Sequence, residues 1–277
     1  MPRLTVLLPV HRPPALLPHA IESVLAQSVA DFELMVICDG APEETVACAR
    51  SYGTRDQRVK TFVFPKGKRH GEAHRHTALT QANGRFVAHI CDDDLWFSNH
   101  LEEIERLLAD ADFGHVINVA VNPDGGLSAS ACDLTNPNLR KRFTNAAYNK
   151  FGPTFCAYRL DAYRRLPEGW TPAPSEVWTD LHMWRKFLRR DDMKFASRGV
   201  VTALQFPALR RRTMSLEDRA AENERWHRRI QDAGERACII EQAIQSLNTQ
   251  LTQHDLDVSG RWNAPLRAAM RLVNRRR

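Results

Sequence analysis

Short apolar runs alternate with amphipathic segments through the first part of the chain. The apolar runs are residues 4–9, 32–38, 59–64 and 86–91, with residues 115–121 as a candidate fifth. The segments between them place apolar residues at helical spacing, over residues 16–27, 42–52, 72–81 and 99–109. Strands that alternate with helices at this spacing form βαβ units. The pattern therefore predicts an α/β fold with a mostly parallel sheet sandwiched by helices.

Polar residues and turn residues follow three of the predicted strands. Pro9, Val10 and His11 end the first strand, Asp39 ends the second, and Asp92–Asp94 follow the fourth. In open α/β sheets, ligands bind in the crevice outside the carboxyl ends of the strands. We therefore expect these residues to face one crevice.

Three consecutive carboxylates, Asp92, Asp93 and Asp94, end the apolar run that begins at Phe86. They repel one another unless a cation lies among them. A hard divalent cation shared with a phosphate-bearing substrate would supply that positive charge. A second interpretation is a solvated acidic turn that starts the next helix, because Asp is favoured at N-caps and in first turns.

Residues 123–213 are less regular than the first half. A helix is predicted over residues 179–188, and Asp180 lies at its start, where an acidic N-cap is common. Residues 195–206 resemble a strand. The run Arg210–Arg212 has two interpretations, a contact to a departing diphosphate or an ordinary solvated face.

A long helix is predicted from Ser215 to Gln253, with Ser215 and Asp218 in a capping-box-like arrangement. Its apolar positions alternate spacings of four and three, as in a heptad seam. They are Trp226, Ile230, Ala233, Ala237, Ile240, Ile244, Leu247 and Leu251. Two interpretations stay open: the helix packs on the domain before it, or residues 226–251 form the coiled coil of a homodimer.

The basic character of the chain belongs to its last segment. Six arginines and no acid lie between Val258 and Arg277, which accounts for the whole formal net charge of +6. Residues 255–277 form a basic amphipathic pattern with Trp262 at its edge, which suits an anionic membrane surface. A disordered end and a helix docked on the protein are the alternatives. Nucleic acid is not expected as a partner, because no aromatic platform accompanies the charge.

Several classes of protein are disfavoured. No apolar run reaches the roughly 18–20 residues of a membrane-spanning helix, and the first residues do not resemble a signal peptide. Six cysteines without a CxxC spacing indicate free thiols and a cytoplasmic protein. The sequence contains no GxGxxG, GxxxxGK[ST] or GxSxG motif. These absences argue against dinucleotide-binding oxidoreductases, P-loop proteins and hydrolases with a nucleophile elbow, respectively.

Several motifs in order resemble those of the inverting family-2 glycosyltransferases, which have the nucleotide-diphospho-sugar-binding (GT-A) fold. The matching stretches are TVLLPVHRPP with AIESVLAQS, DFELMVICDGAPEET, and GEAHRHTALTQANGRFVAHICDDDLWFSNHLE. The resemblance implies a GT-A domain over residues 1–213. Its nucleotide-binding half would be residues 1–122 and its acceptor half residues 123–213, followed by the long helix (214–254) and the basic tail (255–277).

The resemblance assigns a role to each residue of the expected crevice. Pro9, Val10 and His11 match the site for the nucleotide base and ribose. Asp39 would bind the base, typically uracil, and Arg75 would lie near the base or the phosphates.

In the acidic triplet, the resemblance places Asp92 near the ribose and makes Asp93 the favoured ligand of Mn²⁺ or Mg²⁺, with Asp94 as an alternative ligand. The sequence departs from the family pattern at Cys38 and Cys91, where the family commonly has Asp. It also has histidine at positions 11 and 76, where Tyr and Asn are common. These departures leave the choice of base and the metal ligands open.

Asp180 matches the residue that serves the family as general base, deprotonating the acceptor hydroxyl for in-line inversion. The resemblance implies non-processive, metal-dependent transfer of a sugar from a nucleotide diphosphate, with UDP-sugars expected. The acceptor would be a hydroxyl of a cell-surface glycan or lipid-linked molecule, which fits a peripheral location on the inner face of the plasma membrane. The alternative from another class is a non-catalytic nucleotide-sugar-binding or membrane-scaffold protein of the same fold.

Overall fold

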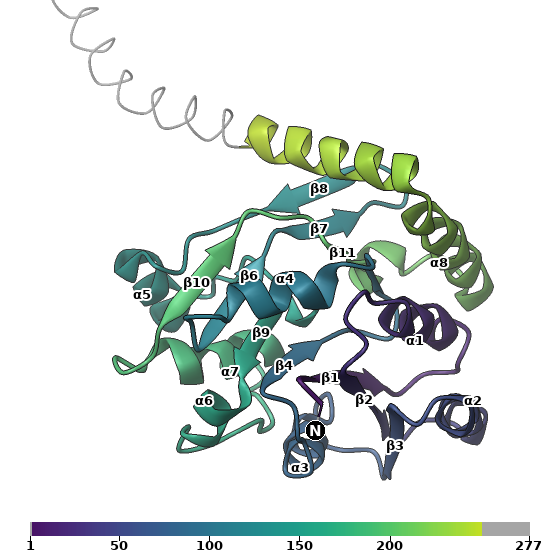
Figure 1. The fold of residues 1–277 in the computed structure, drawn as a ribbon, viewed down its shortest axis with the longest axis horizontal. Coiled ribbons are helices and arrows are strands. Elements are labelled where there is room, and N and C mark those ends of the chain that lie inside the picture. The colour runs from purple at the N-terminus through teal and green to yellow at the C-terminus, as the bar shows by residue number, and fades with distance from the viewer. Residues whose placement is uncertain (1, 251–277) are drawn as a thin grey trace, which may run out of the picture.

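The computed structural model describes residues 2–250 and is built around one seven-stranded sheet (Figure 1). The strand order is β10-β6-β9-β4-β1-β2-β3. The bounds are β1 Leu4–Val10, β2 Phe32–Asp39, β3 Val59–Phe64, β4 Phe86–His89, β6 Phe113–Val116, β9 Cys156–Arg159 and β10 Phe195–Arg198. All neighbours pair in parallel except β9, which is antiparallel to β4 and β6. The mainly parallel sheet confirms the predicted α/β class.

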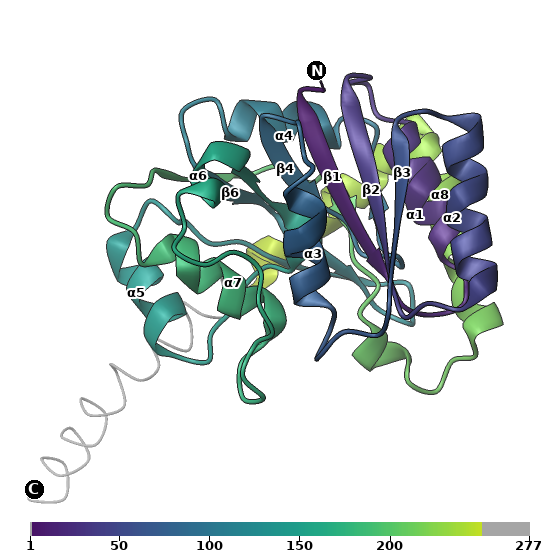
Figure 2. The ribbon, with the colours of Figure 1, turned by 90° about the horizontal axis from the view of Figure 1, so that it is seen from below.

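Helices pack on both faces of this sheet (Figure 2). Those of the first half are α1 Leu17–Leu25, α2 Glu43–Arg55, α3 Glu72–Leu79 and α4 His100–Leu107. Those of the second half are α5 Pro137–Asn145, α6 Leu160–Arg164, α7 Thr179–Leu188 and α8 Leu216–Gln231, with short 3₁₀ turns at Pro153–Phe155 and Ala208–Arg211. Each helix predicted in the first half is present to within a few residues, because its buried face follows the helical spacing of its apolar residues.

The two halves of the chain share the central sheet. Strand β9 comes from the second half and lies between β4 and β6 of the first. Two small antiparallel sheets extend the structure, one formed by β5 Leu95–Trp96 with β11 Ala203–Leu204, the other by β7 Asn118–Val121 with β8 Leu127–Ser130. The second half of the chain is therefore built onto the first, so residues from both can reach a common cavity.

Two segments expected to be single strands are each divided between sheets. Residues 115–121 contribute the end of β6 and then β7, and residues 195–206 contribute β10 and then β11. Both segments pass from the main hydrophobic core to a second core beneath the β7–β8 hairpin. Residues 115–121 are nearly all buried, whereas residues 195–200 are partly exposed and burial resumes at Val201. The pattern of apolar residues does not show where either segment changes sheet.

The single helix expected from Ser215 to Gln253 is wrong. Helix α8 ends at Gln231, and a second helical stretch covers residues 233–250 at an angle to it, along the β7–β8 hairpin (Figure 1). Asp232 has extended backbone, and its carboxylate accepts a hydrogen bond from the N–H of Glu235 at 2.8 Å. The sequence Asp-Ala-Gly-Glu is thus a new helix start, a capping-box signal inside an apparent heptad pattern.

The second core covers the apolar faces of both helical stretches. Trp226 and Ile230 of α8 are buried there, followed by Ile239 and Ala243 of the next stretch. Ile240, expected in the seam, is 37% exposed. Both helical stretches therefore pack on the domain, as the first interpretation expected. A continuous coiled-coil seam from residue 226 to 251 is not formed.

No helix within residues 2–250 is both long and apolar enough to cross a membrane. The basic tail, residues 255–277, and the end of the predicted seam at Leu251 lie outside the described residues.

Candidate active site

One cavity of about 790 Å³ opens at the carboxyl ends of β1, β2 and β4. The lining includes all nine residues that the sequence singled out: Pro9, Val10, His11, Asp39, Arg75, Asp92, Asp93, Asp94 and Asp180. Adjacent parallel strands end at the same edge of the sheet, which brings together seven of the nine. Arg75 reaches the cavity from α3. Asp180 reaches the cavity from the start of α7, in the second half of the chain.

Asp39 is a buried carboxylate with several donors around it. Its Oδ1 atom accepts a hydrogen bond from the N–H of Gly67 at 2.6 Å, and the Lys66 ammonium pairs with its Oδ2 atom. Burial would raise the pKa of Asp39, but these bonds outweigh that effect and lower it. Gly71 has a φ of +69°, and a Cβ atom there would lie 2.5 Å from the Asp39 carboxyl group. Asp39 therefore stays ionised and needs glycine at position 71.

Arg75 is a buried guanidinium group on α3. Its Nη2 atom donates to the carbonyl oxygen of His70 at 3.0 Å, and its Nη1 atom has no hydrogen-bond partner. The guanidinium lies over the ring of Trp170, 5.0 Å from the centroid. Within residues 2–250 no carboxylate forms an ion pair with it. A buried cation without a carboxylate is costly, so this position suits an anionic ligand such as a phosphate.

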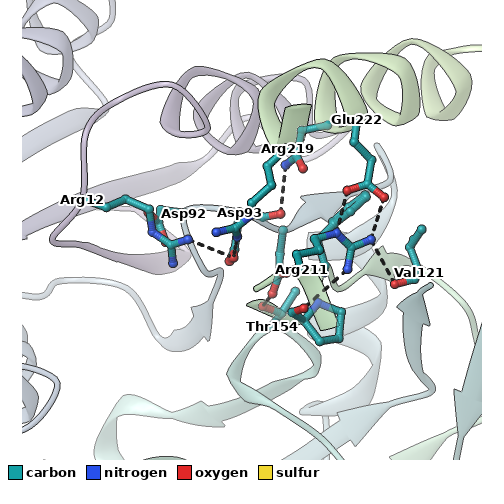
Figure 3. Close-up of polar contacts among 12 residues, drawn as sticks. Arg12, Asp92, Asp93, Val121, Thr154, Arg211, Arg219 and Glu222 are labelled. Atoms are coloured by element: carbon teal, nitrogen blue, oxygen red, sulfur yellow. Dashed lines mark hydrogen bonds and ion pairs between the residues drawn. The ribbon is translucent and has the colours of Figure 1, made fainter. Parts of the chain in front are cut away.

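The acidic triplet is neutralised by two arginines from distant parts of the chain (Figure 3). Arg12, just after β1, places its Nε atom 2.8 Å from Oδ2 of Asp92 and its Nη1 atom 3.3 Å from Oδ2 of Asp93. Arg219 of α8 donates to the same Asp93 oxygen at 2.7 Å. Asn223, one turn further along α8, donates to the Asp93 carbonyl oxygen at 2.9 Å. Helix α8 is thus part of the site.

Asp94 differs from its two neighbours. Thr154 donates to its Oδ2 atom, and the N–H of Phe206 donates to its Oδ1 atom at 2.9 Å. Burial, followed by the nearby charge of Asp93, raises the pKa of Asp94 far above its usual range. The interpretation that the triplet starts a helix is wrong, because β5 follows it and α4 begins only at His100.

The carboxylates of this cluster fit a hard divalent cation. Ligand atoms of Cys91, Asp93 and Asp94 lie within 4.8 Å of one another, and the buried Asp92 carboxylate beside them is paired with Arg12. Mg²⁺ and Mn²⁺ bind in proteins through one or two carboxylates together with substrate phosphates. Burial raises the pKa of the Cys91 thiol well above its usual range, so this thiol is a poor ligand for such an ion. The arrangement favours Asp93 over Asp94 as a ligand.

Asp180 is held in the cavity at the start of α7. Its Oδ1 atom accepts a hydrogen bond from the N–H of Leu181 at 2.8 Å, and its Oδ2 atom accepts one from Nδ2 of Asn149 at 2.8 Å. Burial nevertheless dominates and raises the pKa of Asp180 to about 6. A carboxylate with a raised pKa is a stronger base than a solvated one and is still ionised at neutral pH.

Sequence reasoning missed four contributors to the site: Arg12, Asn149, Arg219 and Asn223. Arg12 could have been found from the sequence. It follows the first strand directly, and the acids follow the strand that pairs with it, so an ion pair between them could be expected. The others lie on irregular or distant segments and reach the site only through tertiary packing.

The run Arg210–Arg212 does not act as a unit. Arg211 is buried, and its guanidinium forms a bidentate pair with Glu222 of α8 at 2.5 and 2.7 Å (Figure 3). It also donates to the carbonyl oxygen of Val121 at 3.1 Å. Arg210 contacts Asn122, and Arg212 is exposed. Arg211 therefore fastens α8 to the domain, a role that neither interpretation of the run included.

The sequence profile described as "Glycosyl transferase family 2" matches residues 5–166, more than half of the chain. The chain belongs to this family. The match covers the strands and acids that line the nucleotide side of the cavity. Asp180 and α8 lie beyond it, so their roles depend on the geometry.

Two bacterial relatives have defined names. A GalNAc(5)-diNAcBac-PP-undecaprenol beta-1,3-glucosyltransferase of Campylobacter jejuni is 26% identical over 194 residues, 68% of this chain and 62% of the relative. The UDP-Glc:alpha-D-GlcNAc-diphosphoundecaprenol beta-1,3-glucosyltransferase WfgD of Escherichia coli is 32% identical over 98 residues, 35% of this chain and 38% of the relative. The glycosyltransferase described here thus spans less than two thirds of the length of either.

Solved structures confirm the GT-A fold. TarS of S. aureus in complex with UDP-GlcNAc aligns with 74% of this chain and 58% of its own, at a TM-score of 0.55 and 17% identity. The mannosyltransferase PcManGT of Pyrobaculum calidifontis, in complex with GDP-Man and Mn²⁺, aligns with 88% of this chain and 80% of its own, at a TM-score of 0.52 and 16% identity.

Proposed function

We propose that this enzyme transfers a sugar from a uridine diphosphate donor to a hydroxyl of a lipid-linked glycan, with inversion at the sugar carbon. One observation carries the proposal. A single cavity holds a buried guanidinium without a carboxylate partner, a cluster of carboxylates, and a separate carboxylate whose pKa is raised to about 6. These are the groups needed to hold a diphosphate and to take a proton from an acceptor.

The residues that would bind the donor are assigned from their charges and positions in the cavity. The guanidinium of Arg75 would pair with the diphosphate, since a planar fork of donors matches phosphate oxygens. Asp39 would accept a hydrogen bond from the base, and Pro9, Val10 and His11 would line the site of the base and ribose. The printed names of WfgD and of the TarS complex support a uridine diphosphate donor.

Asp93 would hold Mg²⁺ or Mn²⁺, with Asp92 beside it near the ribose. When bound, such an ion neutralises the negative charge of the departing diphosphate. The PcManGT complex, which contains Mn²⁺, supports a divalent ion in this fold. Arg12 and Arg219 contact the same carboxylates and keep the cluster neutralised before a donor arrives.

Asp180 would act as the general base. As the acceptor oxygen bonds to the sugar carbon, its proton passes to the Asp180 carboxylate, and the bond from carbon to diphosphate oxygen breaks on the opposite face. Asn149 holds the carboxylate in place through its amide. In-line displacement with one base gives inversion.

The proposed acceptor class comes from the relatives. Two of them are named for undecaprenol-diphosphate-linked acceptors. Such an acceptor lies in a membrane surface, which agrees with the expected peripheral location on the inner face of the plasma membrane. Contact of residues 255–277 with an anionic surface remains a prediction.

A panel of sugar nucleotides, scored by release of nucleoside diphosphate with and without Mn²⁺, tests the proposal. We expect release from a UDP-sugar that depends on an undecaprenol-diphosphate-linked acceptor, with the opposite anomeric configuration in the product by NMR. Release from none of the donors, with nucleotide binding retained, would contradict the proposed activity.

Replacing Asp93 by alanine should weaken Mn²⁺-dependent binding of UDP by at least about tenfold, because the favoured carboxylate ligand is lost. Calorimetric titration of UDP with Mn²⁺ and with EDTA measures this effect. The matched control is Asp124→Ala in the exposed turn between β7 and β8, which should bind like the wild type. Equal UDP affinity of the wild type with Mn²⁺ and with EDTA would exclude the metal and leave Arg12 and Arg219 to neutralise Asp92 and Asp93.

A further inference from the structure

Helix α1 packs against α8 (Figure 2). Three side chains of types that can bind a metal ion lie close together at this contact. His19 and Glu22 are three residues apart and therefore lie on one face of α1. His227 comes from α8. One ligand atom from each residue lies within 4.8 Å of the other two, and the two imidazole centroids are 5.7 Å apart. None of the three lines the active-site cavity.

The polar atoms in this cluster converge without bonding to one another. The Nδ1 atom of His19 is buried and has no hydrogen-bond partner among residues 2–250. The only hydrogen-bond contact of the His227 ring in the described part of the chain is a weak one, 3.5 Å to Nε2 of Gln231. Neither histidine forms an ion pair with Glu22 within residues 2–250. His19 and His227 are partly buried and Glu22 is exposed. Buried polar atoms are normally satisfied, so the Nδ1 atom of His19 beside a second imidazole and a carboxylate suits an ion.

The ligand set selects the kind of ion. Two imidazoles and one carboxylate are typical of Zn²⁺ with one open position for water, and imidazole also suits Ni²⁺ and Cu²⁺. Mg²⁺ and Ca²⁺ prefer oxygen ligands alone, which separates this cluster from the carboxylates of the active site.

A neighbouring residue orients the carboxylate. The hydroxyl of Tyr52 on α2 donates to Oε1 of Glu22 at 2.9 Å, which leaves Oε2 available. Hydrogen bonds of this kind hold metal-ligating carboxylates in place.

We propose that His19, Glu22 and His227 bind a transition-metal ion of the Zn²⁺ class that fastens α8 to α1. This site goes beyond the proposed sugar transfer. Its structural consequence is that the ion stabilises the docked position of α8, the helix that carries Arg219 and Asn223 to Asp93.

Thermal unfolding of the full chain, without an affinity tag and with the exposed Cys238 replaced by serine, tests the site. At a Zn²⁺ concentration about 100-fold above Kd, the Tm should rise by about 5 °C relative to EDTA. His227→Gln and His19→Ala should each weaken Zn²⁺ binding by at least about 100-fold and abolish this rise. Asp93→Ala should retain it, which separates this site from the catalytic cluster. His182→Ala, a partly exposed histidine on α7, is the matched control and should also retain it.

Co²⁺ binding provides a second readout that does not depend on stability. The parent protein should show the visible absorption of four-coordinate Co²⁺ at one equivalent, and His227→Gln should not. The same absorption in both proteins, its absence from the parent, or an equal rise in Tm in both would overturn the proposal. Loss of sugar transfer with an intact zinc response would count against the proposed function and not against this site.

Discussion

Replacing Asp180 by asparagine should lower kcat by a factor of about 10²–10⁴, the usual contribution of a general base. The amide keeps the size of the side chain and can still accept from the N–H of Leu181, but it cannot take the acceptor proton. The Kd for UDP should stay within about twofold, because Asp180 lies on the acceptor side. Single-turnover kinetics with a lipid-linked acceptor and calorimetry with UDP separate the two effects.

The pH profile supplies a second readout of Asp180. Burial raises the pKa of this carboxyl to about 6, and a base works only in its deprotonated form. The rate of the wild type should therefore fall as the pH drops through about 6. The residual rate of Asp180→Asn should not follow that change.

The stability of the folded protein should depend on pH in the opposite sense to the reaction rate. The pKa of Asp180 is higher in the folded state than the ordinary value of 3.8, so the folded protein binds the proton more tightly than the unfolded chain. Its contribution to stability is present below about pH 4 and is lost as the pH rises through about 6. At pH 8, Asp180→Asn should therefore unfold at a higher temperature than the wild type.

Asp161→Asn is a matched control for this experiment. Asp161 lies at the start of α6, and its Oδ1 atom accepts from the next N–H, that of Ala162, at 3.0 Å. This repeats the bond between Asp180 and Leu181, but at an exposed position away from the cavity. Asp161→Asn should keep full activity. An Asp180→Asn variant with unchanged kcat would refute the assignment of the base.

Replacing Arg211 by methionine should lower the free energy of unfolding by about 3–5 kcal/mol, the cost of leaving a buried charge without its partner. The side chains of Arg211 and Glu222 are 0% and 4% exposed, and two hydrogen bonds join them. Without the guanidinium, the Glu222 carboxylate and the Val121 carbonyl oxygen lose their donor. Urea unfolding measures the change.

A second substitution distinguishes the lost ion pair from lost packing. Arg211→Met combined with Glu222→Leu removes both charges and should recover a large part of the stability. Arg212→Met changes the same residue type at the exposed neighbouring position and should stay within about 0.5 kcal/mol of the wild type. A loss below about 1 kcal/mol in Arg211→Met would show that this pair does not hold α8.

Much of the nucleotide side of the site could be predicted without a structure. The apolar runs that became β1, β2 and β4 are short and almost wholly buried, and the helices between the strands have clear apolar faces. Strand β3 lies at the edge of the sheet and is partly exposed. Parallel strands end at one edge of the sheet. Local pattern and one rule of topology therefore sufficed to place Asp39 and Asp92–Asp94 in one cavity.

The C-terminal region shows why local pattern is insufficient there. Spacings of four and three continue from Trp226 to Leu251, although the helix breaks at Asp232. Burial then moves from the expected Ile240 to Ile239 and Ala243. The break depends on the Asp-Ala-Gly-Glu cap and on the surface offered by the β7–β8 hairpin, and the second of these exists only after folding.

The sequence by itself determined which acids, strands and helices make up the nucleotide side, because those features follow from residue order within each βαβ unit. The tertiary structure alone decided their charge partners. Arg12 and Arg219 both contact Asp93 although they are 81 and 126 residues away along the chain. Arg211 was read from the sequence as a diphosphate contact or a solvated residue, yet it is buried against Glu222. The electrostatic role of an arginine depends on the carboxylates that folding brings to it, and the pattern of neighbouring residues does not contain that information.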